Sequence, residues 1–206
     1  MAIRYRSIAK EASAEQIIDR SRFIAHIGRC TSREEAERYI ADIRERYRDA
    51  THNVPCFICG EKQELMWASD DGEPSGTSGP SMLQMFAREG LTNIVCVVTR
   101  YFGGIKLGTG GLVRAYTSSA RLALEAAGIR EVRDMREIRL RIPYAALEKL
   151  RHMEQNLPFA MYDLEYTDSV TLSISYEPED EENVLLPIRE LLAAEPEILE
   201  SKSFLR

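Results

Sequence analysis

The stretch that decides the fold is residues 94–111, IVCVVTRYFGGIKLGTGG. Its first part, 94–99, is apolar on both faces, which predicts a strand that is covered on both sides. Five glycines follow, and a helical pattern then covers about 109–127 until Gly128, a residue type that commonly ends helices. A strand, a glycine-rich loop and a helix in this order predict an α/β domain.

The chain before this stretch alternates between strand and helix patterns. We expect three strands, a helix, two strands and a short helix, near 3–9, 14–19, 22–30, 33–49, 54–60, 64–69 and 81–89. Ser32 and Glu35 have the spacing of a capping box at the start of the 33–49 helix. Together with 94–127, these elements form the predicted α/β domain.

The last third of the chain has a separate pattern. Strands are expected at 136–142, 159–166, 170–176 and 197–204, with helices across 147–157 and 179–194. A turn at 167–169 joins the second and third strands as a hairpin. The order β-α-β-β-α-β predicts a ferredoxin-like domain, so the fold class of the whole chain is α+β.

The charge of the chain also changes along its length. Residues 1–134 contain 19 Lys and Arg against 18 Asp and Glu, a net charge of +1. Residues 135–206 contain 8 against 15, a net charge of −7, and the two values add to the −6 of the whole chain. We therefore predict two domains, 1–134 and 135–206.

Composition bears on the location of the protein. No apolar run approaches the roughly 20 residues of a membrane span, and the chain start lacks the apolar core of a signal peptide. The four cysteines lie on strand-like segments, whereas a disulfide framework would lie in loops: Cys30, Cys56, Cys59 and Cys96. We expect a cytoplasmic protein with reduced thiols, no membrane partner and no cofactor.

Two loops, 70–79 and 100–111, gather most of the chain's twelve glycines. Glycines and cations meet at or near the expected start of the 109–127 helix: Gly108, Gly110, Gly111, Arg100, Lys106 and Arg114. Free amides and the positive end of the helix dipole bind anions at such a position. The alternative is that these glycines only let the helix pack closely on the sheet.

The 70–79 loop has the opposite charge. Asp70, Asp71 and Glu73 can hold Mg²⁺ through their oxygens, or they can clamp the cations of the second loop, which is the interpretation we favour. The hydroxyl residues of this loop are Ser75, Thr77 and Ser78. Neither serine has the flanking glycines of Gly-x-Ser-x-Gly, so nucleophilic catalysis is weakly supported.

His52, just before an expected strand, is the histidine that we place near these loops. It can act as a base, as a metal ligand or as a hydrogen-bonded turn residue, and the last is the commonest. Cys56 and Cys59 have zinc-like spacing, but residues three apart on a strand face opposite sides. Tyr101 and Phe102 are interpreted as packing residues rather than as platforms for base stacking. The residues alone assign no catalytic group and no metal ligand.

Three segments, RDATHN (48–53), 70–79 and 100–116, resemble the IMPACT/YigZ family. The resemblance implies a first domain with the fold of the second domain of a small-subunit ribosomal protein. It also implies a ferredoxin-like last domain similar to the C-terminal domains of elongation factor G. The cleft shared by the family would be lined by His52, Asp70, Asp71, Glu73, Ser75, Thr77, Arg100, Tyr101, Lys106 and Arg114.

The resemblance also guides the functional hypothesis, because the eukaryotic relatives are linked to translational control through protein partners. Our leading hypothesis is a non-enzymatic, translation-associated regulatory factor that binds RNA, the ribosome or a ribosome-bound protein partner through the anion-binding cleft. The alternative is a Mg²⁺-dependent enzyme or a nucleotide-binding protein acting on a phosphorylated small molecule. RNA binding normally requires a basic surface, so residues 1–134 would have to bind the RNA.

Overall fold

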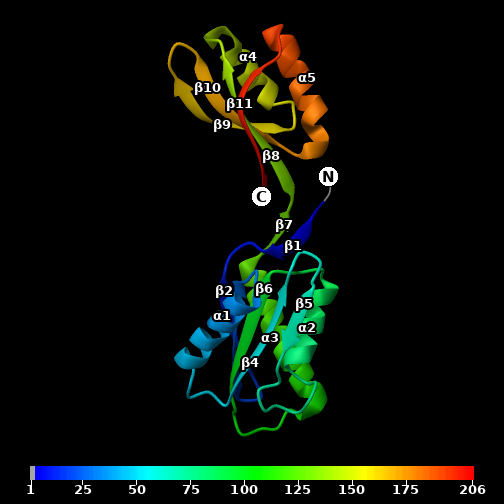
Figure 1. Ribbon diagram of the computed structural model, residues 1–206. Helices are drawn as coiled ribbons and strands as arrows, with labels where there is room; N and C mark the ends of the chain where they lie inside the picture. Colours follow the sequence, from blue (N-terminus) through cyan, green and yellow to red (C-terminus); the bar gives the residue numbers. More distant parts are fainter. Residues whose placement is uncertain (1–2) are drawn as a thin grey trace. The chain divides into compact units, whose positions relative to one another are not determined.

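The computed structural model describes residues 3–206, which form two compact units (Figure 1). The first unit is Tyr5–Glu131, and the second contains Val132–Arg206 together with residues 3–4. Within residues 3–206, no helix combines the length and the apolar character that crossing a membrane requires. Each unit has its own sheet and its own buried apolar cluster.

The first unit contains a five-stranded sheet in which every neighbouring pair is antiparallel. The strands follow the order β2 (Ala12–Ile18), β3 (Ser21–Arg29), β6 (Ile94–Tyr101), β4 (His52–Cys59) and β5 (Leu65–Ala68). The helices of this unit are α1 (Arg33–Arg46), α2 (Gly79–Arg88) and α3 (Gly108–Ala127) (Figure 1). The central strand is therefore the apolar strand of the 94–111 stretch.

The side chains of β6 alternate between two layers. Ile94, Cys96 and Val98 pack in a cluster with buried residues of α2 and α3. Val95 and Val97 pack on the other side with buried residues of α1. The expectation that 94–99 is covered on both faces is confirmed. The sheet is antiparallel, and helices α2 and α3 cover one of its faces while α1 covers the other.

Some elements differ from the expected ones. The amide of Glu35 donates to Ser32 Oγ at 3.3 Å, as in a capping box, but the Glu35 carboxylate accepts from the Thr31 amide at 2.7 Å. The structure also contains a strand that the sequence pattern does not predict, β7 (Ile129–Val132), which pairs with β1 (Tyr5–Ile8) in a two-stranded sheet. Four residues are too few for a strand pattern to stand out from the adjacent helix.

The second unit follows the expected order of elements. These are β8 (Asp134–Ile142), α4 (Tyr144–Glu154), β9 (Phe159–Tyr166), β10 (Val170–Tyr176), η1 (Pro178–Asp180), α5 (Glu181–Leu192) and β11 (Glu197–Leu205). The strands form one antiparallel sheet in the order β11-β8-β10-β9, and β9 and β10 form the expected hairpin. Residues of β8, α4 and α5 share one buried cluster, so the helices cover the same face of this sheet.

We expect the fragment 132–206 to fold alone and to unfold cooperatively. Its apolar cluster lies entirely within the fragment, and Arg133 and Arg206 exchange two backbone hydrogen bonds, of 2.9 and 3.1 Å. Circular dichroism during urea unfolding measures the transition. The variant Leu140→Asp is the control that should lose it, because Leu140 is completely buried. An unmodified fragment without a cooperative transition would contradict the predicted two-domain organisation.

Candidate functional site

The two glycine-rich loops meet in the first unit through a buried ion pair. Arg100, near the end of β6, donates from one terminal nitrogen to Glu73 Oε1 at 2.6 Å. Glu73 belongs to the loop that precedes α2, and both side chains are less than 7% exposed, at 6% and 4%. The prediction that an acid of the first loop pairs with a cation of the second is confirmed.

Further groups surround this pair. The Tyr116 hydroxyl donates to the same Glu73 oxygen at 2.7 Å. Burial and this hydrogen bond raise the pKa of Tyr116, so the phenol stays protonated and remains a donor. The Arg100 guanidinium also donates to Ser21 Oγ at 3.3 Å, and it lies 5.4 Å from the ring centroid of Phe23. The buried carboxylate and the buried guanidinium are thus held from several elements.

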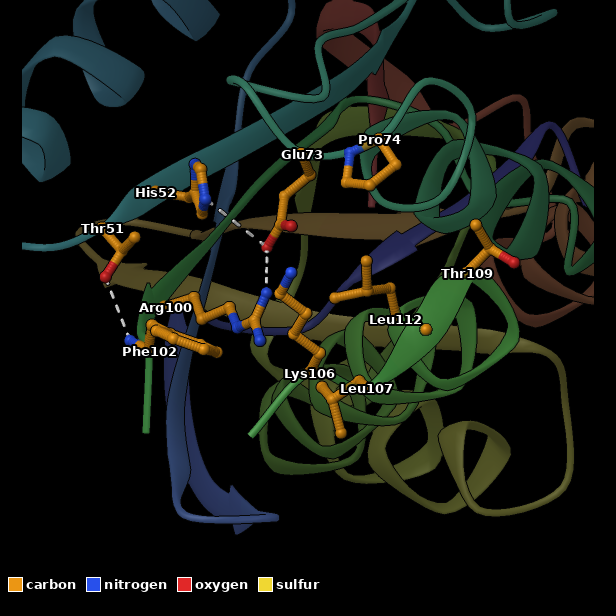
Figure 2. Close-up of a pocket in the computed structure, with 11 residues that line it drawn as sticks. Thr51, His52, Glu73, Pro74, Arg100, Phe102, Lys106, Leu107, Thr109 and Leu112 are labelled. Atoms are coloured by element: carbon orange, nitrogen blue, oxygen red, sulfur yellow. Dashed lines mark hydrogen bonds and ion pairs between the residues drawn. The ribbon is translucent and has the colours of Figure 1, made fainter. Parts of the chain in front are cut away.

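His52, the first residue of β4, points its ring toward Glu73 (Figure 2). Its Nδ1 lies 2.7 Å from the Asp71 carbonyl oxygen. Because a carbonyl only accepts hydrogen bonds, Nδ1 must carry the proton. The other ring nitrogen, Nε2, lies 3.9 Å from Glu73 Oε1. The backbone therefore fixes the orientation of the ring and directs Nε2 toward the cavity.

A cavity of about 460 Å³ opens beside the Glu73–Arg100 pair (Figure 2). This volume lies within the range of roughly 300–1,000 Å³ that is typical of small-molecule sites. The lining residues are Thr51, His52, Glu73, Pro74, Arg100, Phe102, Lys106, Leu107, Gly108, Thr109 and Leu112. The lining combines charged and polar residues with apolar side chains, which supply much of the wall.

The start of α3 forms one end of the cavity. Gly108 and Thr109 are exposed, and the first turn of α3 has no acidic residue and no side chain bonded to its amides. Lys106, also exposed, forms no ion pair with any residue of the described range. Free amides, the helix dipole and an uncompensated ammonium group together favour an anion at this end.

Asp70 and Asp71 brace the first loop. Asp70 accepts from Ser78 Oγ at 2.6 Å and from the Gly76 amide at 2.7 Å. Burial opposes ionisation of Asp70, but these hydrogen bonds outweigh it, and its pKa is lowered. Asp71 accepts from Arg44 and from the Asn53 amide, both at 2.7 Å. Both oxygens of each carboxylate are therefore engaged, and the cation that pairs with Asp71 comes from α1 rather than from the second loop.

A family model described as the Impact N-terminal domain matches residues 19–124, more than half of the chain. This chain belongs to the IMPACT family. The IMPACT family member YvyE of Bacillus subtilis is 37% identical over 179 residues, which cover 87% of this chain and 82% of that protein. YigZ of Escherichia coli is 36% identical over 132 residues, covering 63% and 65%. A crystal structure described as that of a hypothetical protein has a TM-score of 0.60 at 27% identity, covering 95% and 96%. The resemblance to the IMPACT/YigZ family is confirmed.

Not all the residues expected in the cleft of this IMPACT-family chain reach the cavity. Arg114 lines a neighbouring depression with Gly111 and Asp19. It follows Leu112 by two residues, about 200° around the helix, so it projects from another side of α3. Tyr101 follows Arg100 on a strand and therefore faces the other side of the sheet, where its hydroxyl donates to Asp49 at 2.9 Å.

Three other residues expected in the cleft are also absent from the cavity lining. Ser75 is exposed on the first loop. Thr77 is buried, and its hydroxyl donates to the Pro74 carbonyl oxygen at 2.6 Å, so it closes a turn within the loop. Gly110 lies in the first turn of α3 but does not line the cavity, whereas Gly108, two residues earlier, does. Of the predicted residues, five line the cavity: His52, Glu73, Arg100, Lys106 and Gly108.

Other residues that complete the site carry no charge or glycine signal in the sequence. Leu112 and Tyr116 lie four residues apart on α3 and share one helix face, a spacing that identifies them once the helix is expected. Phe102 lines the cavity and is 46% exposed, although it was interpreted as a packing residue. The four cysteines lie in apolar clusters of the first unit. All four are buried and free, and Cys56 and Cys59 belong to different apolar clusters.

Proposed function

We propose that this protein is a non-enzymatic, translation-associated regulatory factor of the cytoplasm that binds RNA, free or within the ribosome, through the cavity beside α3. Membership of the IMPACT family supports the association with translation, because the eukaryotic relatives in this family are linked to translational control. The anionic nature of the ligand is supported independently by the charges of the site. A translation-related protein partner is the other possibility that binding experiments address.

One observation carries the proposal: Lys106 and the open start of α3 stand beside an ion pair that is already neutral. The Arg100 charge is balanced by Glu73 at 2.6 Å, so this pair contributes no net charge to the cavity. Lys106 and the α3 amides then leave the cavity with a positive end. A phosphate group satisfies these donors and is neutralised by them.

The geometry does not favour the Mg²⁺-dependent alternative. The carboxylates of Asp70 and Asp71 accept hydrogen bonds from the loop itself, from α1 and from β4. Glu73 Oε1 is shared by Arg100 and Tyr116. A divalent cation would have to displace these donors and would lie beside a buried guanidinium, which repels it.

We also propose the finer folds and boundaries expected from the sequence. The sheet order β11-β8-β10-β9, with helices on one face, supports a ferredoxin-like second domain, 135–206, similar to the C-terminal domains of elongation factor G. The first domain, 1–134, would share the fold of the second domain of a small-subunit ribosomal protein. Fold similarity of this kind adds to the proposal of a role in translation but does not carry it.

The proposed function predicts that binding of the full chain to ribosomes and RNA weakens with salt and depends on Lys106. Lys106→Ala should reduce the slope of log affinity against log salt by about 0.7, the value for one phosphate contact on a single strand. Lys62→Ala is the matched control, because Lys62 is exposed in the same unit but does not line the cavity. Ribosome co-sedimentation and filter binding over a salt series measure both variants. Equal slopes for the two variants would contradict the proposal.

A further inference from the structure

Phe102 is an exposed aromatic ring held in a fixed position. Its backbone amide donates to Thr51 Oγ1 at 3.0 Å, so the main chain at this residue is anchored to the segment before β4. The Arg100 guanidinium carbon lies 5.4 Å from the Phe102 ring centroid, and the residue remains 46% exposed. A ring that rests on a buried cation and still exposes nearly half of its surface is ready to stack with another planar group.

Arg100 gives a second, independent indication of a ligand. The residue is only 5% exposed and lines the cavity (Figure 2), and its terminal nitrogens are engaged by Glu73 and Ser21. Its Nε, however, is buried without an acceptor among residues 3–206. Buried polar groups normally have a partner, so this side chain marks a place where the protein alone does not complete the hydrogen bonding.

The cavity contains apolar side chains in addition to the cations and amides that a phosphate requires. A phosphate in a backbone needs cations and amides, which Lys106 and the start of α3 supply. An apolar or aromatic part of a ligand can instead be buried against the apolar lining residues Pro74, Phe102, Leu107 and Leu112. A volume of about 460 Å³ accommodates both parts of one ligand.

We infer that the cavity binds a single unpaired nucleotide, with its base against Phe102 and its phosphate at Lys106 and the start of α3. This inference rests on the proposed function and names the part of the RNA that is recognised. Bases in a duplex are hidden by stacking, whereas single strands present bases that stack on aromatic side chains. The cavity therefore selects single-stranded RNA.

The charge of the chain agrees with recognition of one nucleotide. Residues 1–134 have a net charge of only +1, and residues 135–206 have a net charge of −7. Wide contact with a phosphate backbone would face repulsion from the many carboxylates. A cavity that binds one base and one phosphate makes few phosphate contacts. The slope of log affinity against log salt should therefore be small.

The test measures binding of the full chain to a single-stranded RNA decamer, to the same sequence as a duplex, and to the free nucleoside monophosphates AMP and UMP. We expect the single strand to bind at least about tenfold more tightly than the duplex. Phe102→Leu should weaken binding of the single strand about 5- to 150-fold, the range for loss of one stacked base, without changing the salt slope. Lys106→Ala should instead reduce the slope.

Two further variants separate stacking from folding. Phe102→Tyr keeps an aromatic ring and should retain binding within about threefold, and urea unfolding of Phe102→Leu followed by Trp67 fluorescence checks that this variant is folded. Tyr166→Leu is the control for an exposed aromatic ring outside the cavity, since Tyr166 is 55% exposed in the second unit. It should bind as the unmodified chain does.

The outcomes distinguish this inference from the function on which it rests. Equal binding of duplex and single strand, with no effect of Phe102→Leu but a reduced slope for Lys106→Ala, overturns the single-nucleotide inference and leaves RNA binding in place. Binding of AMP or UMP that requires Phe102, without binding of either RNA, supports the nucleotide cavity and overturns the RNA-binding function. Absence of binding to every probe at low salt overturns both.

Discussion

Replacing Glu73 by alanine is expected to lower the free energy of unfolding of the first unit by about 3–5 kcal/mol, because the variant leaves a buried charge without its partner. Arg100 is 5% exposed, and its Nε already lacks an acceptor. The Tyr116 hydroxyl would lose its acceptor as well.

Urea unfolding followed by tryptophan fluorescence measures this effect in the full chain. Trp67 is the only tryptophan of the protein, and it lies on β5 of the first unit, stacked 5.5 Å from the Phe57 ring. Its signal therefore reports the unit that contains Glu73 and Arg100 without interference from the other unit.

A variant that removes both charges is the matched control. Glu73→Leu combined with Arg100→Met replaces the pair by apolar groups of similar volume, and such replacements are often neutral or stabilising. We expect this double variant to be more stable than Glu73→Ala by at least about 2 kcal/mol, and to fail in RNA binding because the site is altered. Unfolding of Glu73→Ala within about 1 kcal/mol of the unmodified chain would mean that the ion pair does not hold the two loops together.

Much of the fold could be predicted because each decisive segment carries its own signal. The segment 94–98 is apolar on both faces, and this pattern is unusual unless both faces are covered. The last third alternates so regularly that the order of its elements was predicted correctly. The strand β7 was missed because its four residues follow α3 directly, where no turn residue other than Gly128 separates the two patterns.

The composition of the cavity was less predictable. The charges and glycines of the two segments correctly predicted that Glu73 and Arg100 meet, since opposite charges attract each other. The charge of Arg114 predicted that it would line the same cavity, but it lines a neighbouring depression. The direction of a side chain depends on its angle around the helix, which net charge does not reveal. Apolar lining residues such as Leu112 and Phe102 resemble ordinary core residues in a sequence.

Two glycines of the second loop are expected to respond to alanine in opposite ways. A Cβ added to Gly103 would lie 2.0 Å from the carbonyl carbon and oxygen of Arg20 and 2.5 Å from the Ser21 amide nitrogen. These are backbone atoms of the turn between β2 and β3, which cannot rotate away as a side chain does. We expect Gly103→Ala to lower the free energy of unfolding by at least about 2 kcal/mol.

Gly110→Ala is the matched change at a site with room. Gly110 lies in α3, and the nearest atom to an added Cβ is a terminal nitrogen of the flexible Arg114 side chain, at 3.5 Å. Alanine favours the helix over glycine by about 0.5–1 kcal/mol, so this variant should be more stable than the unmodified chain. Urea unfolding followed by Trp67 fluorescence compares the two variants, and a similar loss in both would show that the approach of Gly103 to Arg20 does not matter.

The same pair of variants links the loop to the site. Gly103 lies between Phe102 and the segment that leads to Lys106, so any displacement that relieves the contact with Arg20 moves the aromatic ring and the ammonium group of the cavity together. RNA binding should therefore fall in Gly103→Ala, measured below its unfolding transition, and persist in Gly110→Ala, whose backbone amide is unchanged. Retention of full binding by a folded Gly103→Ala protein would mean that the position of this loop does not control the site.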